Sequence, residues 1–275
     1  MPDAISPARS QDRAIGQIPP PNPKLAAKPP VCIILHQENS NPGHVGQWFV
    51  RNGYSLDIRK PRFGDPLPPT LEHHCGCVIF GGPMSANDKD AFVRTEIDWI
   101  GVPLRERKPF LGICLGAQML TVNLGAKVGF HPEEFVEIGY YPLLPAEPGG
   151  DALGQLPDHV YEWHKEGFEL ASGARLLATS PGAFPNQAFI YGPAAVGVQF
   201  HPEITYAQVH RWTGHNPQRL AMKGARAWAQ HIEGHVTHGP KVQAWLDRFL
   251  SRWIRGRLTE PAAASSPSIG PARAA

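Results

Sequence analysis

The sequence predicts a three-layer α/β domain in which a mostly parallel sheet lies between two layers of helices. Short apolar, β-branched segments alternate with segments of helical periodicity, a pattern typical of a parallel sheet with helical crossovers. A chain of 275 residues suits one large α/β domain or two small ones. Hydrophobic residues make up 42% of the chain and charged residues 18%, so most of it is expected to fold around a full core.

Four strands and three helices are predicted in the first half. The apolar run Val31–Leu35 is typical of a strand buried on both faces. Three further strands are predicted over Tyr54–Ile58, Cys77–Phe80 and Phe110–Ile113. The first helix is indicated by three residues on one face and a glycine that would end it: Val45, Trp48, Phe49 and Gly53.

The second and third helices are predicted in the same way. Asn87 or Asp88 is expected to cap the second. Its side chains of helical spacing are Phe92, Val93, Glu96, Ile97 and Ile100. The third is expected over Gln118–Leu124, after the fourth strand.

Shorter strands and then helices are predicted in the second half. The strands are expected over Phe135–Leu143, Leu176–Thr179, Gln187–Tyr191 and Ala195–Phe200. Beyond Thr205 the pattern is helical, and Pro240 suits the first position of the last helix. That helix carries an apolar stripe: Val242, Trp245, Leu246, Phe249, Leu250, Trp253 and Ile254.

The opposite face of the last helix is basic, with Lys241, Arg248, Arg252 and Arg255. A basic amphipathic helix can lie on a membrane or dock a partner. Such a stripe more often covers the core of its own domain, and we favour that interpretation.

Both ends of the chain are expected to be disordered, with the folded domain over residues 31–257. Residues 1–30 and 258–275 are rich in Pro, Ala and Ser and have no apolar period. The four cysteines are too few for a disulfide framework, and the N-terminus lacks the apolar core of a secretory signal. We therefore expect a cytoplasmic protein.

The composition also excludes two classes of partner. A net charge of +2 argues against a strong sequence-independent grip on nucleic acid. No apolar run approaches the ~20 residues that span a bilayer, so no membrane partner is expected.

Gly112-Ile113-Cys114-Leu115-Gly116 is the strongest chemical signal. An apolar strand leads directly into Gly-x-Cys-x-Gly and then a helix, which is the cysteine form of a nucleophile elbow. The flanking glycines permit the strained turn, and the positive end of the helix would stabilise a negatively charged sulfur. The alternative is a buried structural cysteine beside two glycines.

Two further segments supply what a cysteine nucleophile needs. Gln199-Phe200-His201-Pro202-Glu203 ends a predicted strand, so His201 would be the general acid and base and Glu203 would orient it. Phe80-Gly81-Gly82-Pro83-Met84-Ser85 ends another strand, where the N–H of Gly82 and that of Leu115 are the expected oxyanion donors. In isolation, either segment would indicate only a turn.

Together, and in this order, the three segments resemble the class I glutamine amidotransferases, most nearly the glutaminase part of GMP synthase. The resemblance covers roughly Val31 to Glu203 and implies a flavodoxin-like three-layer sandwich. It also implies that Cys114 attacks the glutamine side-chain amide, that His201 protonates the leaving ammonia and that Glu203 completes the triad. Water would then hydrolyse the γ-glutamyl thioester. Gln118 would line the glutamine pocket.

Two other clusters carry weaker expectations. His164, in Tyr161-Glu162-Trp163-His164, lies where the family often has a strand ending in a histidine near the glutamine pocket, so we expect it to bind substrate or support the site. His73-His74-Cys75-Gly76-Cys77 offers metal-ligating side chains, but spacing this tight rarely lets one chain wrap a tetrahedral zinc. We expect no metal and no organic cofactor.

The expected function is hydrolysis of the glutamine side-chain amide. Only about 70 residues follow Glu203, and no Gly-x-x-x-x-Gly-Lys-Ser/Thr loop occurs, so we expect a stand-alone enzyme without an ATP-using synthase domain. Three alternatives remain: a hydrolase of γ-glutamyl peptides or γ-glutamyl amines, an ammonia-supplying subunit gated by a synthase partner, and a non-catalytic regulatory module. A pocket open beyond the amide nitrogen would favour the first.

Overall fold

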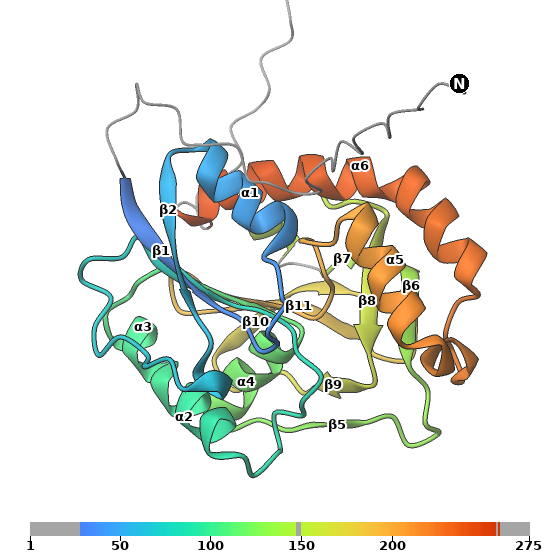
Figure 1. The fold of residues 1–275 in the computed structure, drawn as a ribbon, viewed down its shortest axis with the longest axis horizontal. Coiled ribbons are helices and arrows are strands. Elements are labelled where there is room, and N and C mark those ends of the chain that lie inside the picture. The colour runs from blue at the N-terminus through green and yellow to red at the C-terminus, as the bar shows by residue number, and fades with distance from the viewer. Residues whose placement is uncertain (1–27, 147–149, 257, 259–275) are drawn as a thin grey trace, which may run out of the picture.

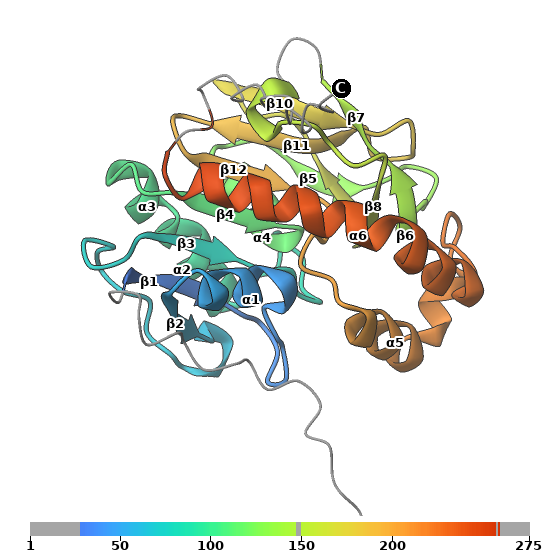
Figure 2. The ribbon, with the colours of Figure 1, turned by 90° about the horizontal axis from the view of Figure 1, so that it is seen from above.

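An eight-stranded sheet forms the middle layer of the protein (Figures 1 and 2). The computed structural model describes residues 28–146, 150–256 and 258, so nearly all of the predicted leader and tail lies outside the described residues. The strand order is β2-β1-β3-β4-β12-β11-β10-β7. The first five strands are parallel, whereas β11, β10 and β7 join them antiparallel. The predicted mostly parallel sheet is confirmed.

The strands fall into the main sheet and two ribbons. The parallel strands are β2 (Tyr54–Arg59), β1 (Lys28–Ile34), β3 (Gly76–Ile79), β4 (Phe110–Ile113) and β12 (Ala195–Val198). The antiparallel ones are β11 (Asn186–Tyr191), β10 (Ala174–Thr179) and β7 (Leu144–Pro145). One ribbon pairs β5 (Val128–Phe130) with β9 (Glu166–Phe168), and the other pairs β6 (Glu137–Pro142) with β8 (His159–His164).

Helices cover both faces of the sheet (Figure 2). On one face lie α1 (Gly43–Arg51) and α6 (Trp228–Trp253), and on the other α2 (Ala91–Trp99), α3 (Gly101–Arg105) and α4 (Leu115–Asn123). Alternate side chains of β1 enter the two cores: Val31 and Ile33 pack on the side of α1 and α6, and Cys32 and Ile34 on the side of α2 to α4. This is the pattern of a strand buried on both faces.

The remaining elements of the described residues are one further helix and three short turns. These are α5 (Tyr206–His215) and the 3₁₀ turns η1 (Pro61–Phe63), η2 (Gly150–Leu153) and η3 (Pro217–Ala221). None of the described helices combines the length and the apolar character needed to cross a bilayer.

The apolar stripe of the last helix faces the protein's own core, as we favoured. Its side chains from Val242 to Trp253 are buried against the sheet. The expected start of this helix at Pro240 is wrong, because α6 begins at Trp228 and continues through the proline. Proline removes one helical hydrogen bond, but buried residues on both sides of it, such as His231 and Trp245, hold the two halves in one helix.

The expected cap of the second helix is also wrong. The N-cap of α2 is Asp90 rather than Asn87 or Asp88. The side chains of Ser85 and Asp88 close a turn of their own, since the backbone N–H of Ser85 donates to Asp88 Oδ2 over 2.9 Å. The Asn87 N–H donates to Ser85 Oγ over 3.1 Å. A side chain whose oxygen already accepts a hydrogen bond within this turn is not available to cap the helix.

The strand register brings the predicted chemical segments to one edge. Gly112 of β4 lies between Ile79 of β3 and Gly197 of β12, so the loops after these three strands leave the sheet side by side. In an open parallel sheet, the edge at the strands' carboxyl ends is where ligands bind.

Candidate active site

A cavity of about 700 Å³ opens at this edge. Cys114, His201, Glu203 and Gly82 all line it, although they come from three separate loops. A Cβ atom placed on Gly81 would lie 2.7 Å from the His201 ring and 3.5 Å from Cys114 Cβ, so the imidazole and the thiol share one small space. The three segments predicted from the sequence therefore converge on a single cavity.

Cys114 lies in a strained turn between β4 and α4. Its φ is 50° and its ψ is −104°, a conformation that side-chain-bearing residues rarely adopt. Its N–H donates to the carbonyl of Val198 over 2.8 Å, and its carbonyl accepts from the N–H of Gln118 over 3.0 Å. These bonds to β12 and α4 hold the residue at the N-terminus of α4.

The glycines on either side allow this turn to pack. A Cβ on Gly116 would lie 2.1 Å from the carbonyl oxygen of Ile79, and one on Gly112 would lie 2.5 Å from the backbone of Gly116. The backbone atoms of β3 and α4 cannot move aside, so both positions require glycine.

His201 is oriented by Glu203, two residues away. Its Nδ1 is 2.8 Å from Glu203 Oε1, and both side chains are about 4% exposed. The backbone N–H of His201 donates to the carbonyl of Tyr161 over 2.8 Å. Trp212 packs edge-on against the His201 ring, with a centroid separation of 4.9 Å. Since Nδ1 is occupied by Glu203, Nε2 is the ring nitrogen that remains for exchanging a proton with Cys114 or a substrate.

Charges around His201 favour its protonated form. Burial alone would lower the pKa of His201, but the neighbouring Glu203 and Cys114 together raise this pKa well above its ordinary value. An imidazolium beside a cysteine sulfur is the arrangement that activates the sulfur as a nucleophile.

The loop after β3 lies against the turn that carries Cys114. A Cβ on Gly82 would lie 3.0 Å from Leu115 Cδ2, so these two residues are neighbours. Leu115 is the first residue of α4, and its N–H has no acceptor within the helix. The two residues expected to supply the oxyanion donors are therefore neighbours, and Leu115 directly follows Cys114.

A buried histidine and glutamate, which the sequence analysis did not single out, hold this loop. His36 follows β1, and its Nδ1 donates to the carbonyl of Gly81 over 3.1 Å. Its Nε2 is 2.8 Å from Glu96 Oε2 of α2, and both side chains are fully buried. The pair thus ties the oxyanion loop to α2. In the sequence, Glu96 falls on the apolar face of the predicted helix. A carboxylate at such a position is rarely buried without a partner, so it could have indicated this contact.

Gln118 and His164 lie behind the cavity and are not among the described residues that line it. Gln118 Nε2 donates to the carbonyl of Glu166 over 2.8 Å. His164 Nδ1 donates to the same carbonyl over 3.0 Å, while its Nε2 lies 3.2 Å from Glu162 Oε2 and 3.3 Å from Glu137 Oε2. Burial lowers the pKa of His164, but the two carboxylates raise it to about 10 overall. Burial raises the pKa of Glu162 to about 7.

The cysteine and histidine run at 73–77 does not assemble into a ligand set in the part of the chain that the structure describes. His74 pairs with Asp57 over 2.9 Å, the exposed His73 pairs with Glu72, and Cys77 is fully buried in β3. These side chains point to different partners.

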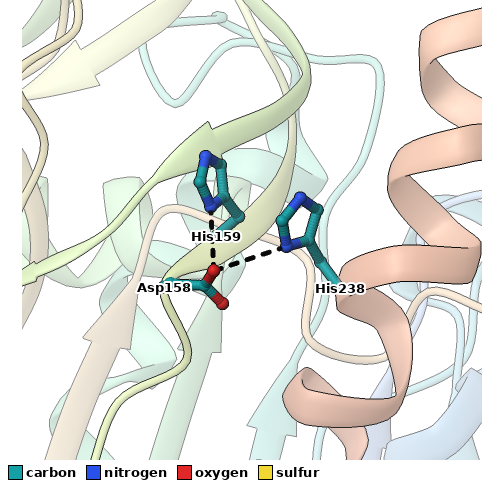
Figure 3. A group of neighbouring side chains, drawn as sticks. All are labelled: Asp158, His159 and His238. Atoms are coloured by element: carbon teal, nitrogen blue, oxygen red, sulfur yellow. Dashed lines mark ion pairs between the residues drawn. The ribbon is translucent and has the colours of Figure 1, made fainter.

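Two other groups have ligand atoms close enough to share a metal: Glu137, Glu162 and His164, and Asp158, His159 and His238. In the second, the Nδ1 atoms of the two histidines lie 3.5 and 3.7 Å from Asp158 Oδ2 (Figure 3). The ammonium of Lys241 already contacts both oxygens of this carboxylate, at 3.1 and 3.3 Å. A metal ion would have to compete with that cation.

Comparisons with known proteins agree with the geometry. The glutamine amidotransferase class-I family model matches residues 47–212. The glutamine amidotransferase-like protein YfeJ of Salmonella typhimurium is 32% identical over 230 residues, which cover 80% of this chain and 95% of that protein. The glutamine-hydrolysing GMP synthase of Porphyromonas gingivalis is 36% identical over 146 residues, which cover 52% of this chain but 27% of the synthase.

Solved structures give the same result. A glutamine amidotransferase from Methylobacillus flagellatus superposes with a TM-score of 0.77 at 27% identity, covering 83% of this chain and 95% of that one. A second, from Thermotoga maritima, has a TM-score of 0.73 at 31% identity, covering 82% and 97%. Since the family model matches more than half of the chain and YfeJ aligns over nearly its whole length, this chain belongs to the class-I glutamine amidotransferase family.

Proposed function

We propose that this protein hydrolyses the side-chain amide of glutamine through a triad of Cys114, His201 and Glu203. The observation that carries the proposal is the convergence of the strained Cys114 turn and the His201–Glu203 pair on one cavity. Membership of the family supports amide hydrolysis in general, and this geometry supports the assignment of the steps to residues.

In the first step, the Cys114 sulfur attacks the amide carbon and forms a tetrahedral adduct. The negative charge that develops on the amide oxygen accepts hydrogen bonds from the N–H groups of Gly82 and Leu115. The carbon–nitrogen bond then breaks as His201 Nε2 gives its proton to the leaving nitrogen. Ammonia departs, and a γ-glutamyl thioester remains on Cys114.

In the second step, His201 is the base. Its Nε2 takes a proton from water, the resulting hydroxide attacks the thioester carbon, and the carbon–sulfur bond breaks to give glutamate and free Cys114. Glu203 keeps the ring aligned through Nδ1 and stabilises its positive charge in both steps. Gln118 and His164 both donate a hydrogen bond to the Glu166 carbonyl, and through it they position the segment behind the cavity.

Labelling with a glutamine-mimicking diazoketone tests the proposal without requiring turnover. The intact mass of the wild type should increase by one adduct, and Cys114→Ala should show none. Cys75→Ala is the matched control, because Cys75 is a partly exposed thiol and does not line the cavity, so this variant should be labelled like the wild type. An adduct on Cys114→Ala, or none on the wild type, would refute the triad assignment.

The cavity supports a second candidate, the hydrolysis of γ-glutamyl amides whose leaving group is larger than ammonia. About 700 Å³ lies within the range of pockets that hold drug-sized ligands, roughly 300–1,000 Å³, and leaves room beyond a single amino acid. Comparing the release of glutamate from glutamine and from N-substituted γ-glutamyl amides distinguishes the two candidates.

A synthase partner that receives the ammonia is a further possibility, because the matched region of GMP synthase is joined to a much longer chain. Glutamine hydrolysis that stays low in the isolated protein, although Cys114 is labelled, would favour a partner-gated subunit.

A further inference from the structure

Three arginines line the active-site cavity beyond the catalytic residues. Arg62 lies on η1, whereas Arg211 on α5 and Arg219 on η3 come from neighbouring elements some 150 residues further along the chain, and all three residues line the same cavity. An arginine side chain keeps its positive charge at any physiological pH.

Few negative charges on the cavity wall offset these arginines. Of the residues that the structure describes, two carboxylates line the cavity, those of Glu38 and Glu203, and Glu203 is already paired with His201. Arg62 and Arg211 each donate to one backbone carbonyl, of His36 over 3.4 Å and of Asn39 over 3.2 Å. The guanidinium of Arg219 makes no hydrogen bond or ion pair with any described residue. All three therefore retain donors for a ligand.

A cavity of this charge discriminates among leaving groups. Its positive potential repels the free ammonium of a γ-glutamyl diamine and attracts a carboxylate. Guanidinium groups bind carboxylates through paired, charge-assisted hydrogen bonds. Ammonia from glutamine makes no use of this region.

We propose that the leaving group of the physiological substrate is an amino acid or short peptide, whose carboxylate binds to Arg62, Arg211 and Arg219. This inference rests on the proposed triad and specifies its substrate class as γ-glutamyl amino acids. The peptide-like carbon–nitrogen bond breaks, His201 gives its proton to the departing amine, and water then releases glutamate from Cys114. The products are glutamate and the free amino acid.

Three substrates that differ only at the leaving group test this assignment. They are γ-glutamylglycine, γ-glutamylglycinamide and γ-glutamyl-ethylenediamine, in which the group beyond the scissile bond is anionic, neutral and cationic. We expect kcat/KM for γ-glutamylglycine to exceed that for the glycinamide by about tenfold or more, with the diamine the poorest. Raising the ionic strength should reduce this advantage, because salt screens the attraction.

Substitution of Arg219 supplies the matched variant. Arg219→Gln should reduce the ratio of kcat/KM for γ-glutamylglycine to that for the glycinamide several-fold, with partial recovery in Arg219→Lys. Arg248→Gln is the control, because Arg248 is an exposed arginine on α6 that does not line the cavity, and its ratio should match the wild type.

Diazoketone labelling separates failure of this inference from failure of the triad. If Cys114 is labelled and glutamine is hydrolysed, but γ-glutamylglycine is no better than the glycinamide, the carboxylate assignment is wrong and the triad stands. If Cys114 is not labelled and none of the amides is hydrolysed, both proposals fail.

Discussion

Gly116 has no side chain, and this allows the turn around Cys114 to pack against β3. The Cβ of an alanine at this position would lie 2.1 Å from the Ile79 carbonyl oxygen, so Gly116→Ala must push α4 away from β3. We expect this variant to lose about 1–3 kcal/mol of stability or more in denaturant unfolding.

Gly214→Ala is the matched control for that measurement. Gly214 is also helical, and apart from its chain neighbours and its own helical turn no described atom would lie within 4 Å of a Cβ added there. Alanine at this position should stabilise the protein by up to about 1 kcal/mol, because it favours the helix. Equal effects at the two glycines would contradict the steric account.

Glu203→Gln tests the charge on His201, the proposed general acid and base. The variant keeps the size of the side chain but removes the carboxylate 2.8 Å from Nδ1, so the pKa of His201 should fall and turnover should drop by roughly 10²- to 10⁴-fold. Titration of the His201 ring by NMR measures the first effect. A titration midpoint equal to that of the wild type would exclude Glu203 as the source of the raised pKa.

Glu96→Ala tests the brace behind the oxyanion loop. It leaves His36 Nε2 buried without a hydrogen-bonding partner, which costs about 1–3 kcal/mol, whereas Glu96→Gln keeps a partner and should retain more stability. Thermal unfolding compares the two. Both substitutions should also slow turnover, because the hydrogen bond from His36 to the Gly81 carbonyl positions the loop after β3.

The sequence located the three loops that form the site, because each has a residue pattern that only a special turn tolerates. It could not reveal the His36–Glu96 contact, whose members lie 60 positions apart and meet only through the sheet. It could not show how Gln118 and His164 are oriented either, since both turn toward the Glu166 carbonyl, on a neighbouring strand.

Among the elements, α6 contributes most to covering one face of the sheet. Trp253 is fully buried, and its indole N–H reaches the carbonyls of Phe110 and Ala194 at 3.3 and 3.2 Å. Trp253→Ala should therefore cost about 3–5 kcal/mol in unfolding free energy. Trp253→Phe should cost less, since it keeps most of the ring but leaves the carbonyls unpaired.

Trp228→Ala, in the first turn of the same helix, is the control. Trp228 is 51% exposed, so its loss should change stability by no more than about 0.5 kcal/mol. A similar loss at both tryptophans would mean that the helix, rather than its buried face, determines the effect.

Elements marked by several consecutive apolar residues were predictable, whereas helix boundaries marked by one or two residues were not. The strands β3 and β4 and the second half of β1 are continuous buried runs, and all three lie close to their predicted positions. Pro240 and the Asn87–Asp88 pair were misleading because each signal is local, whereas the outcome was decided by packing along α6 and by a competing turn.

At the scale of the whole molecule, buried histidines should make stability depend on pH. The pKa of His164 is raised to about 10 and that of His201 is also raised, so the folded protein keeps protons that the unfolded chain releases near pH 6.5. This contribution is complete below pH 6.5 and is lost as the pH rises through the folded values. Glu162, with a pKa of about 7, adds a loss of the same sign between about pH 4.5 and 7.

We therefore expect the urea midpoint of the wild type to fall between pH 7 and pH 10. His164→Gln removes one of these groups and should show a shallower fall over the same interval, whatever its stability at pH 7. A flat or rising profile for the wild type would contradict the charge assignment of this buried cluster.

The strand order couples catalysis to the completion of synthesis. β12 inserts directly beside β4, although some 80 residues of chain separate them, and Cys114 depends on β12 for a backbone bond through Val198. A ribosome-bound chain that has emerged only as far as β11 thus carries the thiol but neither its acid nor the strand that fixes its turn. The turn that holds Cys114 can therefore be completed only after β12 has been synthesised.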